Sequence, residues 1–221
     1  MKKLDKFTII TTLLCLVPII LGVFYYDQLP QTMATQWKGT NEVSNTSPKW
    51  VGVFGIPMVM AVVNFLMNMG TQSDPKKENI NGTLFKFVRL IPVVFSWILY
   101  PITIFMNLED SAIKFNIGLI ANIMIGVIFI IIGNYMPKSK QSYTVGIKLP
   151  WTLNDEDNWN KTHRMAGFLW IMSGVLFILN GIFWMNMIVG IVAIVVCVGV
   201  PFVYSYRLYR KKEEQLKKNS N

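Results

Sequence analysis

Six long apolar stretches alternate with short polar segments along the chain. They run over residues 7–26, 51–70, 85–108, 113–136, 165–184 and 187–206. Each is close to the ~20 residues that a helix needs to cross ~30 Å of hydrocarbon. The pattern predicts an all-α integral membrane protein, built as a bundle of six transmembrane helices.

The Lys and Arg residues are distributed unevenly between the polar segments. All of them except Lys38, Lys49 and Lys114 fall before the first span, between spans two and three, between spans four and five, or after span six. Cytoplasmic segments of membrane proteins are enriched in Lys and Arg. We therefore expect a multi-pass protein of the cell membrane with both termini in the cytoplasm.

The spans pair into three predicted two-helix hairpins. Residues 1–70 form an N-terminal hairpin with an extracytoplasmic loop over residues 27–50. Residues 71–136 form the central hairpin, and residues 137–221 contain a long cytoplasmic loop and the C-terminal hairpin. Because 221 residues leave no room for a large soluble domain beside six spans, we expect function to lie in the bundle or its loops.

The cytoplasmic loop before span five carries helix-start signals. Thr152 to Asp155 have the spacing of a capping box, with Asn154 as an alternative cap. These residues predict a short interfacial helix that leads into span five, with Asp157 able to pair with Lys161 one turn further on. Trp151 and Trp159 have the side chains that are typical of the lipid head-group level.

Candidate chemistry is sparse. The net charge of +9 borders membrane helices, so we expect it to attract anionic lipids rather than nucleic acid. One histidine and two cysteines within spans favour no metal, no cofactor and no enzyme activity. The polar side chains deepest in the spans are amides and hydroxyls, for which we expect interhelical hydrogen bonds, with a substrate path as the alternative. They are Asn64, Asn68, Ser96, Asn122, Ser173 and Asn180.

Three glycines recur every seven residues in span five: Gly167, Gly174 and Gly181. Seven residues are close to two helical turns, so the three lie on one face. Small residues in this arrangement let another helix approach closely. The spacing predicts such a contact, although glycine is frequent in membrane helices in any case.

The cytoplasmic loop and the start of span five contain a long specific pattern, made of Pro137 to Lys140, Tyr143 to Leu153, Trp159 to Arg164, and Gly167. With these residues the chain resembles the SdpI family of bacterial immunity proteins. Ser142 and Lys148 depart mildly from the family, which has Asn and Arg there. The resemblance singles out twelve residues as a cytoplasmic signature: Pro137, Lys138, Tyr143, Gly146, Lys148, Pro150, Trp151, Trp159, Lys161, Thr162, His163 and Arg164. Within it, His163 and Arg164 are interpreted as structural or lipid-binding, with partner recognition as the alternative.

The loop over residues 27–50 resembles a domain of unknown function that often forms the N-terminal half of these proteins. Leu29, Pro30, Trp37 and Lys49 fit its pattern, and Gln36 takes the place of a His. Asn41 and Asn45 stand where the pattern has Gly. Since Asn tolerates left-handed backbone conformations, we expect the turns to be retained.

The resemblance implies a membrane immunity protein that protects its cell against a secreted antimicrobial peptide toxin. As a physical hypothesis, the toxin would meet the outer loop, at Leu29, Pro30, Gln36, Trp37 and Lys49, or the outer ends of the helices. In this interpretation the protein also signals by sequestering a cytoplasmic transcriptional repressor. Its partners would be the toxin, the repressor and membrane lipids, with no direct contact to nucleic acid.

Two other function classes stay open. A small-molecule or lipid transporter would need a wet site lined by Asn64, Asn68, Asn122 and Asn180. A membrane-embedded enzyme or an envelope-stress accessory protein is the third hypothesis, and an enzyme would depend on His163.

Overall fold

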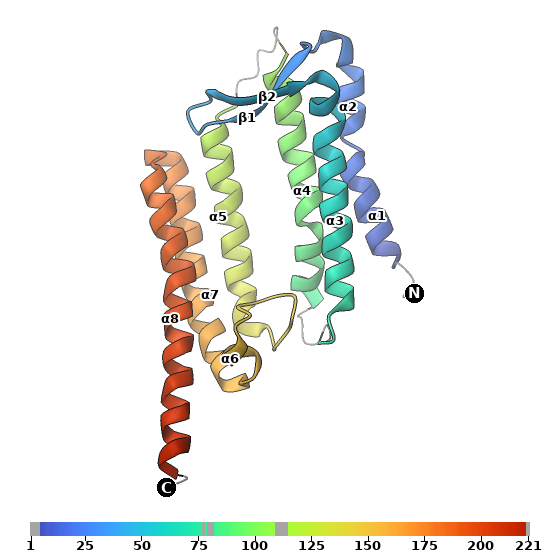
Figure 1. Cartoon of the computed structure of the whole chain (residues 1–221). Coiled ribbons are helices and arrows are strands. Elements are labelled where there is room, and N and C mark those ends of the chain that lie inside the picture. The colour runs from blue at the N-terminus through green and yellow to red at the C-terminus, as the bar shows by residue number, and fades with distance from the viewer. Residues whose placement is uncertain (1–4, 77, 79–81, 109–114, 220–221) are drawn as a thin grey trace. The chain divides into compact units, whose positions relative to one another are not determined.

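The computed structural model describes residues 5–76, 78, 82–108 and 115–219, and it divides into two compact units. Unit 1 comprises residues 1–72 and 85–118, and unit 2 comprises residues 73–84 and 119–221. Within these described residues, six helices are long and apolar enough to cross a membrane. Figure 1 shows the course of the chain through its helices. The six-span, predominantly helical fold is thus confirmed, while the cytoplasmic placement of both termini and the grouping into three hairpins stay predictions. Lys2, Lys3, Lys77 and Lys114 of the charge argument lie outside the described residues.

Unit 1 contains three of these spans. The first consists of α1 (Lys6–Leu16) and α2 (Ile19–Phe24), which are separate because Pro18 interrupts the backbone hydrogen bonding. A π-helical turn over Val51–Gly55 leads into α3 (Ile56–Ser73), and α4 (Gly82–Met106) contains Pro92 and Pro101. The unit has two apolar clusters, one around Met33, Val53, Tyr100 and Ile104 and one around Cys15, Ala61 and Val93.

The loop between the first two spans contains a β-hairpin that the sequence analysis did not predict. After a short 3₁₀ helix (Tyr26–Gln28), β1 (Thr32–Trp37) pairs antiparallel with β2 (Val43–Pro48) (Figure 1). The Asn, Ser and Pro residues of this segment correctly predict a loop outside the spans. The segment has too few alternating apolar residues to predict strands. Register shifts lie between Ala34 and Gln36 and between Gln36 and Trp37.

Unit 2 contains most of α5 (Ile117–Tyr135), then α6 (Pro150–Leu153), α7 (Glu156–Leu179) and α8 (Met187–Asn219). A 3₁₀ turn, Met136–Lys138, follows α5, and a π-helical turn, Asn180–Trp184, extends α7. The helices α7 and α8 run side by side (Figure 1) and pack extensively against each other. The helix predicted to start near Thr152 and lead into span five corresponds to the first turns of α7, and α6 is a separate four-residue helix before it. A place at a membrane interface stays a prediction.

The glycine spacing in α7 corresponds to a close approach of α5. A Cβ built on Gly174 would lie 2.6 Å from the carbonyl oxygen of Gly126, and one on Gly167 would lie 2.7 Å from that of Gly133. A Cβ on Gly181 would lie 2.7 Å from the Cβ of Asn122. The predicted close contact is confirmed, because these three positions leave no room for a side chain.

Two helices extend well past the apolar spans that the sequence predicts. The helix of the fifth span begins at Glu156, before residue 165, and the helix of the sixth continues to Asn219, past residue 206. The helix start at Glu156 follows from its N-cap, Asp155, whose carboxylate accepts from the backbone N–H groups of Asp157 (3.1 Å) and Asn158 (3.4 Å). The cap is therefore Asp155 and not Thr152 or Asn154. The predicted Asp157–Lys161 pair is confirmed at 2.7 Å.

Candidate functional site

The hairpin loop, defined as residues 27–50, is anchored in unit 1 by apolar side chains. Leu29 is 4% exposed and Met33 is fully buried, in a cluster with Val53, Tyr100 and Ile104. Gly52 allows this packing, because a Cβ there would lie 2.7 Å from the Met33 sulfur. The loop is therefore a packed part of unit 1 and not a loose connector.

Two polar side chains hold the hairpin loop in place. The side-chain amide of Asn107 accepts from the Ala34 N–H (2.7 Å) and donates to the Ala34 carbonyl (2.9 Å), so it occupies the outer edge of β1 as a neighbouring strand would. Lys49 is 8% exposed; its ammonium group donates to the Tyr26 carbonyl (3.1 Å) and lies 5.0 Å from the Tyr26 ring centroid. Its charge is thus satisfied by the loop's own backbone and ring.

Asn41 forms the turn of the hairpin in the left-handed conformation, with φ of 65°. Its side chain donates to the Phe115 carbonyl and accepts from the Ile117 N–H, both at 2.9 Å. The expectation that Asn retains a Gly turn is confirmed here. At Asn45, the second such position, the side chain instead accepts from the Thr46 N–H, at 2.9 Å.

The remaining residues of the hairpin loop form its free surface. Gln36 is exposed, Pro30 and Trp37 are half-buried, and Val43 is 53% exposed. Lys38 and Glu42 pair at 3.0 Å next to the turn, where both are solvent-exposed. Of the five residues expected to face a toxin, Leu29 and Lys49 hold the loop from within, and Gln36 is the fully accessible one.

The signature segment, defined as residues 137–164, is centred on a buried ring pair. Trp159 and His163 are fully buried and stack at 3.9 Å between ring centroids. His163 Nε2 accepts from the Ile147 N–H (2.9 Å), so Nδ1 carries the proton and donates to the Trp159 carbonyl (2.8 Å). Trp159 Nε1 donates to the Ser139 carbonyl at 2.8 Å. His163 is therefore structural, which excludes lipid phosphate contact for this residue, and Trp159 is a core residue rather than a head-group anchor.

Gly146 lies directly against these two rings. Its φ is +120°, a conformation that only glycine adopts without strain, and a Cβ there would lie 2.6 Å from both His163 Nε2 and Trp159 Cη2. The glycine is thus required twice, by its backbone conformation and by the space that the rings leave.

A second anchor of the signature segment is Asp74, which is 5% exposed. Its carboxylate accepts from the Ser142 hydroxyl (2.6 Å), the Thr144 N–H (2.8 Å) and the Lys76 N–H (2.7 Å). Burial alone would raise the pKa of Asp74, but these hydrogen bonds outweigh it and hold the pKa below its ordinary value. Asp74 is therefore ionised and fixes the signature segment at Ser142 and Thr144 through hydrogen bonds.

Further bonds connect the signature segment to α8. Trp151 Nε1 donates to Ser205 Oγ (3.0 Å), and the Asn158 amide donates to the Ser205 carbonyl (2.9 Å). Thr162, fully buried, donates to Asn158 (3.0 Å). The other signature side chains lie as follows: Pro137 against Gly167, Lys138 over the Tyr135 ring, Tyr143 beneath the Lys76 ammonium, Pro150 at the start of α6, and Lys148, Lys161 and Arg164 on the surface.

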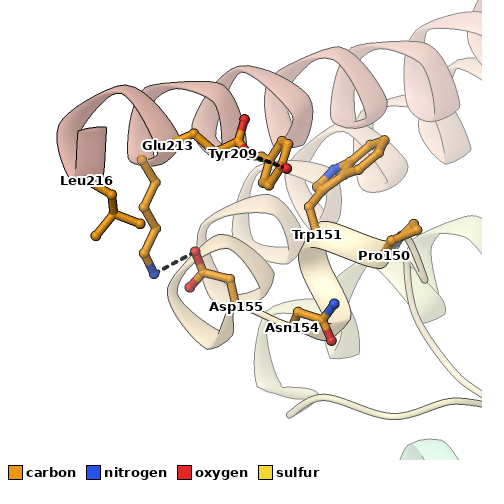
Figure 2. A pocket seen from close by; sticks show the side chains of 8 residues that line it. Pro150, Trp151, Asn154, Asp155, Tyr209, Glu213 and Leu216 are labelled. Carbon is orange, nitrogen blue, oxygen red and sulfur yellow. Dashed lines mark hydrogen bonds and ion pairs between the residues drawn. The ribbon is translucent and has the colours of Figure 1, made fainter. Parts of the chain in front are cut away.

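A cleft of about 440 Å³ opens where α6 meets the end of α8. Trp151 and Tyr209 stack along it, and Asp155 pairs with Lys212 at 2.9 Å, as Figure 2 shows. Burial favours a higher pKa for Asp155, yet the Lys212 and helix N–H donors outweigh it, and the pKa is lowered. The cleft combines an apolar wall with paired charges, which suits a protein partner better than a small ionic ligand.

Unit 1 contains a buried arginine network that the charge pattern of the sequence does not indicate. The Arg89 side chain, 5% exposed, donates to both carboxylate oxygens of Asp5 (2.9 and 2.8 Å) and to the Thr8 hydroxyl (2.9 Å). Its Nε donates to Asn68, and its guanidinium lies 4.5 Å from the Phe7 ring centroid. The distribution of Lys and Arg counted Arg89 with the cytoplasmic loop between spans two and three. Its side chain is instead buried and bonds to residues of α1 and α3 and to the α1 N-cap, Asp5. The signal that could have revealed it is the pair of Asp5 before the first span and Arg89 within the third.

The same network explains the span amides. Asn64 accepts from Thr11 and Thr12, both at 3.0 Å, and donates to the Arg89 carbonyl at 2.9 Å. In unit 2, Asn180 donates to Asn122 at 3.0 Å, and Ser173 donates to the Ala193 carbonyl at 3.3 Å. The expected hydrogen bonds between helices are confirmed. Asn64 and Asn68 bond within unit 1, and Asn122 and Asn180 bond each other within unit 2.

These features define a multi-pass membrane protein with one anchored β-hairpin and one buried inter-span segment. Residues 138–205 match the SdpI/YfhL protein family, and residues 13–61 match a domain of unknown function, DUF1648. The chain is 26% identical over 208 residues to Immunity protein SdpI of Bacillus subtilis (strain 168), an alignment that covers 93% of this chain and 97% of that protein. No solved structure matches. The resemblance to the SdpI family is therefore confirmed, together with its N-terminal domain.

Proposed function

We propose that this protein is a membrane immunity protein that protects the cell carrying it against a secreted antimicrobial peptide toxin. The observation that carries the proposal is the likeness to Immunity protein SdpI along 93% of the chain. That likeness includes both the hairpin loop and the signature segment. The proposal contains no catalytic step, since both ring nitrogens of His163, the single histidine, are used in structural hydrogen bonds.

The toxin contact is the free surface of the hairpin loop. The positive-inside pattern places this loop on the outer side of the membrane, where a secreted peptide arrives. Met33, Asn107 and Lys49 fix the loop from within. The backbone that carries Gln36, Trp37 and Val43 is therefore ordered before binding, which lowers the entropic cost of binding. Leu29 and Lys49 support this surface and make no toxin contact.

A signalling role would use the opposite, cytoplasmic side. Toxin binding would favour a state of the protein in which the signature segment and the cleft beside Trp151 sequester a cytoplasmic transcriptional repressor. Helix α7 supports this coupling, because it begins within the signature segment and continues as a span. Tyr209→Ala, in the cleft wall, should abolish toxin-dependent recovery of the repressor with the membrane fraction and leave protection intact. Equal recovery with and without toxin in the unsubstituted protein would remove the signalling part of the proposal.

The immunity role is tested by survival. A sensitive bacterial strain is challenged with a panel of secreted peptide toxins, with and without this protein expressed, and membrane abundance is measured in the same cells. Selective protection against one peptide is the expected result. Uniform sensitivity at verified membrane abundance would contradict the immunity role and favour the transporter or envelope-stress alternatives.

A further inference from the structure

The pair of α7 and α8 carries a polar cavity of about 480 Å³ on its surface. Five lining residues come from α7, and their spacing of three or four residues places them on one helix face. Tyr204 from α8 closes the cavity. The complete lining is Asp157, Asn160, Lys161, Arg164, Met165 and Tyr204.

The charges in this cavity do not cancel. Lys161 and Asp157 neutralise each other at 2.7 Å. Arg164 is exposed and makes no hydrogen bond or ion pair with any residue that the structure describes. Its guanidinium has five N–H donors in a planar fork, which matches the oxygens of a phosphate group. The Asn160 amide and the Tyr204 hydroxyl line the same cavity and can donate to the remaining oxygens.

The cavity lies where α7 changes from polar to apolar. Residues 156–164 are mostly polar or charged, and an apolar run begins at Met165. Tyr204 lies at the corresponding point of α8, just before Arg207 and the charged end of that helix. Tyrosine is enriched at the boundary between hydrocarbon and head groups. In the predicted orientation this boundary faces the anionic cytoplasmic leaflet, where lipid phosphates are concentrated.

We propose that this cavity binds the phosphate of an anionic phospholipid head group, with Arg164 as its principal ligand. The inference is independent of the proposed immunity role. Asn160 and Tyr204 complete the donor set, and Lys161 keeps Asp157 neutralised so that the carboxylate does not repel the phosphate. Met165, at the membrane end of the cavity, contacts the start of the acyl chains.

The test measures lipid binding to the purified full-length protein by native mass spectrometry. The protein is titrated with phosphatidylglycerol, with phosphatidylcholine as a zwitterionic comparison lipid that has no net charge and should bind more weakly. Arg164→Gln should weaken phosphatidylglycerol binding about fivefold, the effect of one basic residue near a lipid head group. The matched control is Arg210→Gln, an exposed arginine on α8 that lies 4.0 Å from Glu213, and it should leave the affinity unchanged.

A second variant separates a built site from diffuse attraction. Arg164→Lys keeps the charge and removes the planar fork, so it should still bind phosphatidylglycerol more weakly than the unsubstituted protein. Equal losses at Arg164 and Arg210, or no loss at either, would overturn the proposal. Inorganic phosphate alone should bind weakly, and binding as tight as that of the lipid would overturn the assignment to a lipid head group. Unchanged thermal unfolding midpoints establish that each variant is folded, as expected for an exposed side chain.

Discussion

The hairpin loop and the signature segment are both anchored, but by different parts of the chain. In the hairpin loop, backbone pairing between β1 and β2 supplies most of the order, and a few side chains attach the hairpin to its unit. In the signature segment, residues 139–149 contain no strand or helix, and side chains satisfy the backbone: Asp74 binds Thr144, and His163 binds Ile147. Backbone pairing tolerates many side chains, whereas a loop held by side chains depends on their identity. This difference accounts for the long run of family-like residues in the signature segment and the few scattered ones in the hairpin loop.

The largest effect on stability should come from substituting a glycine of the signature segment, compared with substituting a glycine of the hairpin loop. Gly146→Ala forces an alanine to φ of +120° and drives its Cβ into the Trp159 and His163 rings. We expect a loss of about 3 kcal/mol or more in the free energy of unfolding. Gly39→Ala, in the hairpin loop, meets no atom within 4 Å and should change stability by less than about 0.5 kcal/mol.

The measurement is thermal unfolding of both glycine variants in the same detergent. Similar midpoints for the two variants would show that the signature segment does not depend on its side-chain core. Retained stability of Gly146→Ala would contradict the account most strongly, because the added Cβ lies 2.6 Å from an atom of each buried ring and forces one of them to move.

The next effect concerns Asp74 and has a pH signature. Asp74→Asn replaces one of its two acceptor oxygens with a donor that faces other donors, which should cost about 1–3 kcal/mol. The folded-state pKa lies below the ordinary value of 3.8, so the stabilisation is present above that value and is lost as pH falls through the folded pKa. Asp74→Asn should therefore flatten the fall in unfolding free energy on the acid side of pH 3.8. An unchanged fall in unfolding free energy at acid pH would show that Asp74 does not hold the segment. Asp5 and Asp155, whose pKa values are also lowered, account for the pH dependence that remains in the variant.

A smaller effect is expected at Asn107, the side chain that covers the edge of β1. Asn107→Ala removes the two bonds to Ala34 but leaves the cross-strand pairing intact, so the cost should be about 1 kcal/mol. Hydrogen exchange should accelerate at the Ala34 amide and change little at residues 43–48. Accelerated exchange throughout both strands would mean that Asn107, and not backbone pairing, holds the hairpin loop.

The contrast also marks what the sequence can predict. The six spans and the close approach at Gly167, Gly174 and Gly181 follow from composition and spacing, because both depend on local periodicity. The β-hairpin does not follow from the sequence, since its strands are polar and short. The role of Arg89 did not follow either, because burial of a charged side chain depends on a partner far along the chain, here Asp5. For His163 the structural interpretation was correct, but its partner, the Ile147 N–H, came only from the structure.

The candidate functional site could be predicted only in part. Resemblance selected the right segments, but it did not separate contact residues from supporting ones. Leu29, Lys49, Trp159 and His163 proved to be buried supports, whereas Gln36, Lys148 and Arg164 lie on the surface. Exposure is a property of the folded chain, which is why it had to come from the structure.

The most direct test compares protection with abundance in two variants. Val43→Asp changes an exposed side chain of the hairpin loop and should alter stability by less than about 0.5 kcal/mol. His163→Ala empties a buried position in the signature segment and leaves the Ile147 N–H without its acceptor. Leu216→Asp, which adds the same charge at an exposed apolar side chain near the end of α8, is the control.

Survival against the cognate peptide and the amount of protein in the membrane are measured in the same cells. The account predicts that Val43→Asp loses protection at normal abundance, that His163→Ala loses abundance, and that Leu216→Asp retains both. Full protection by Val43→Asp, together with normal abundance but no protection for His163→Ala, would contradict the assignment of toxin contact to the hairpin loop and of support to the signature segment.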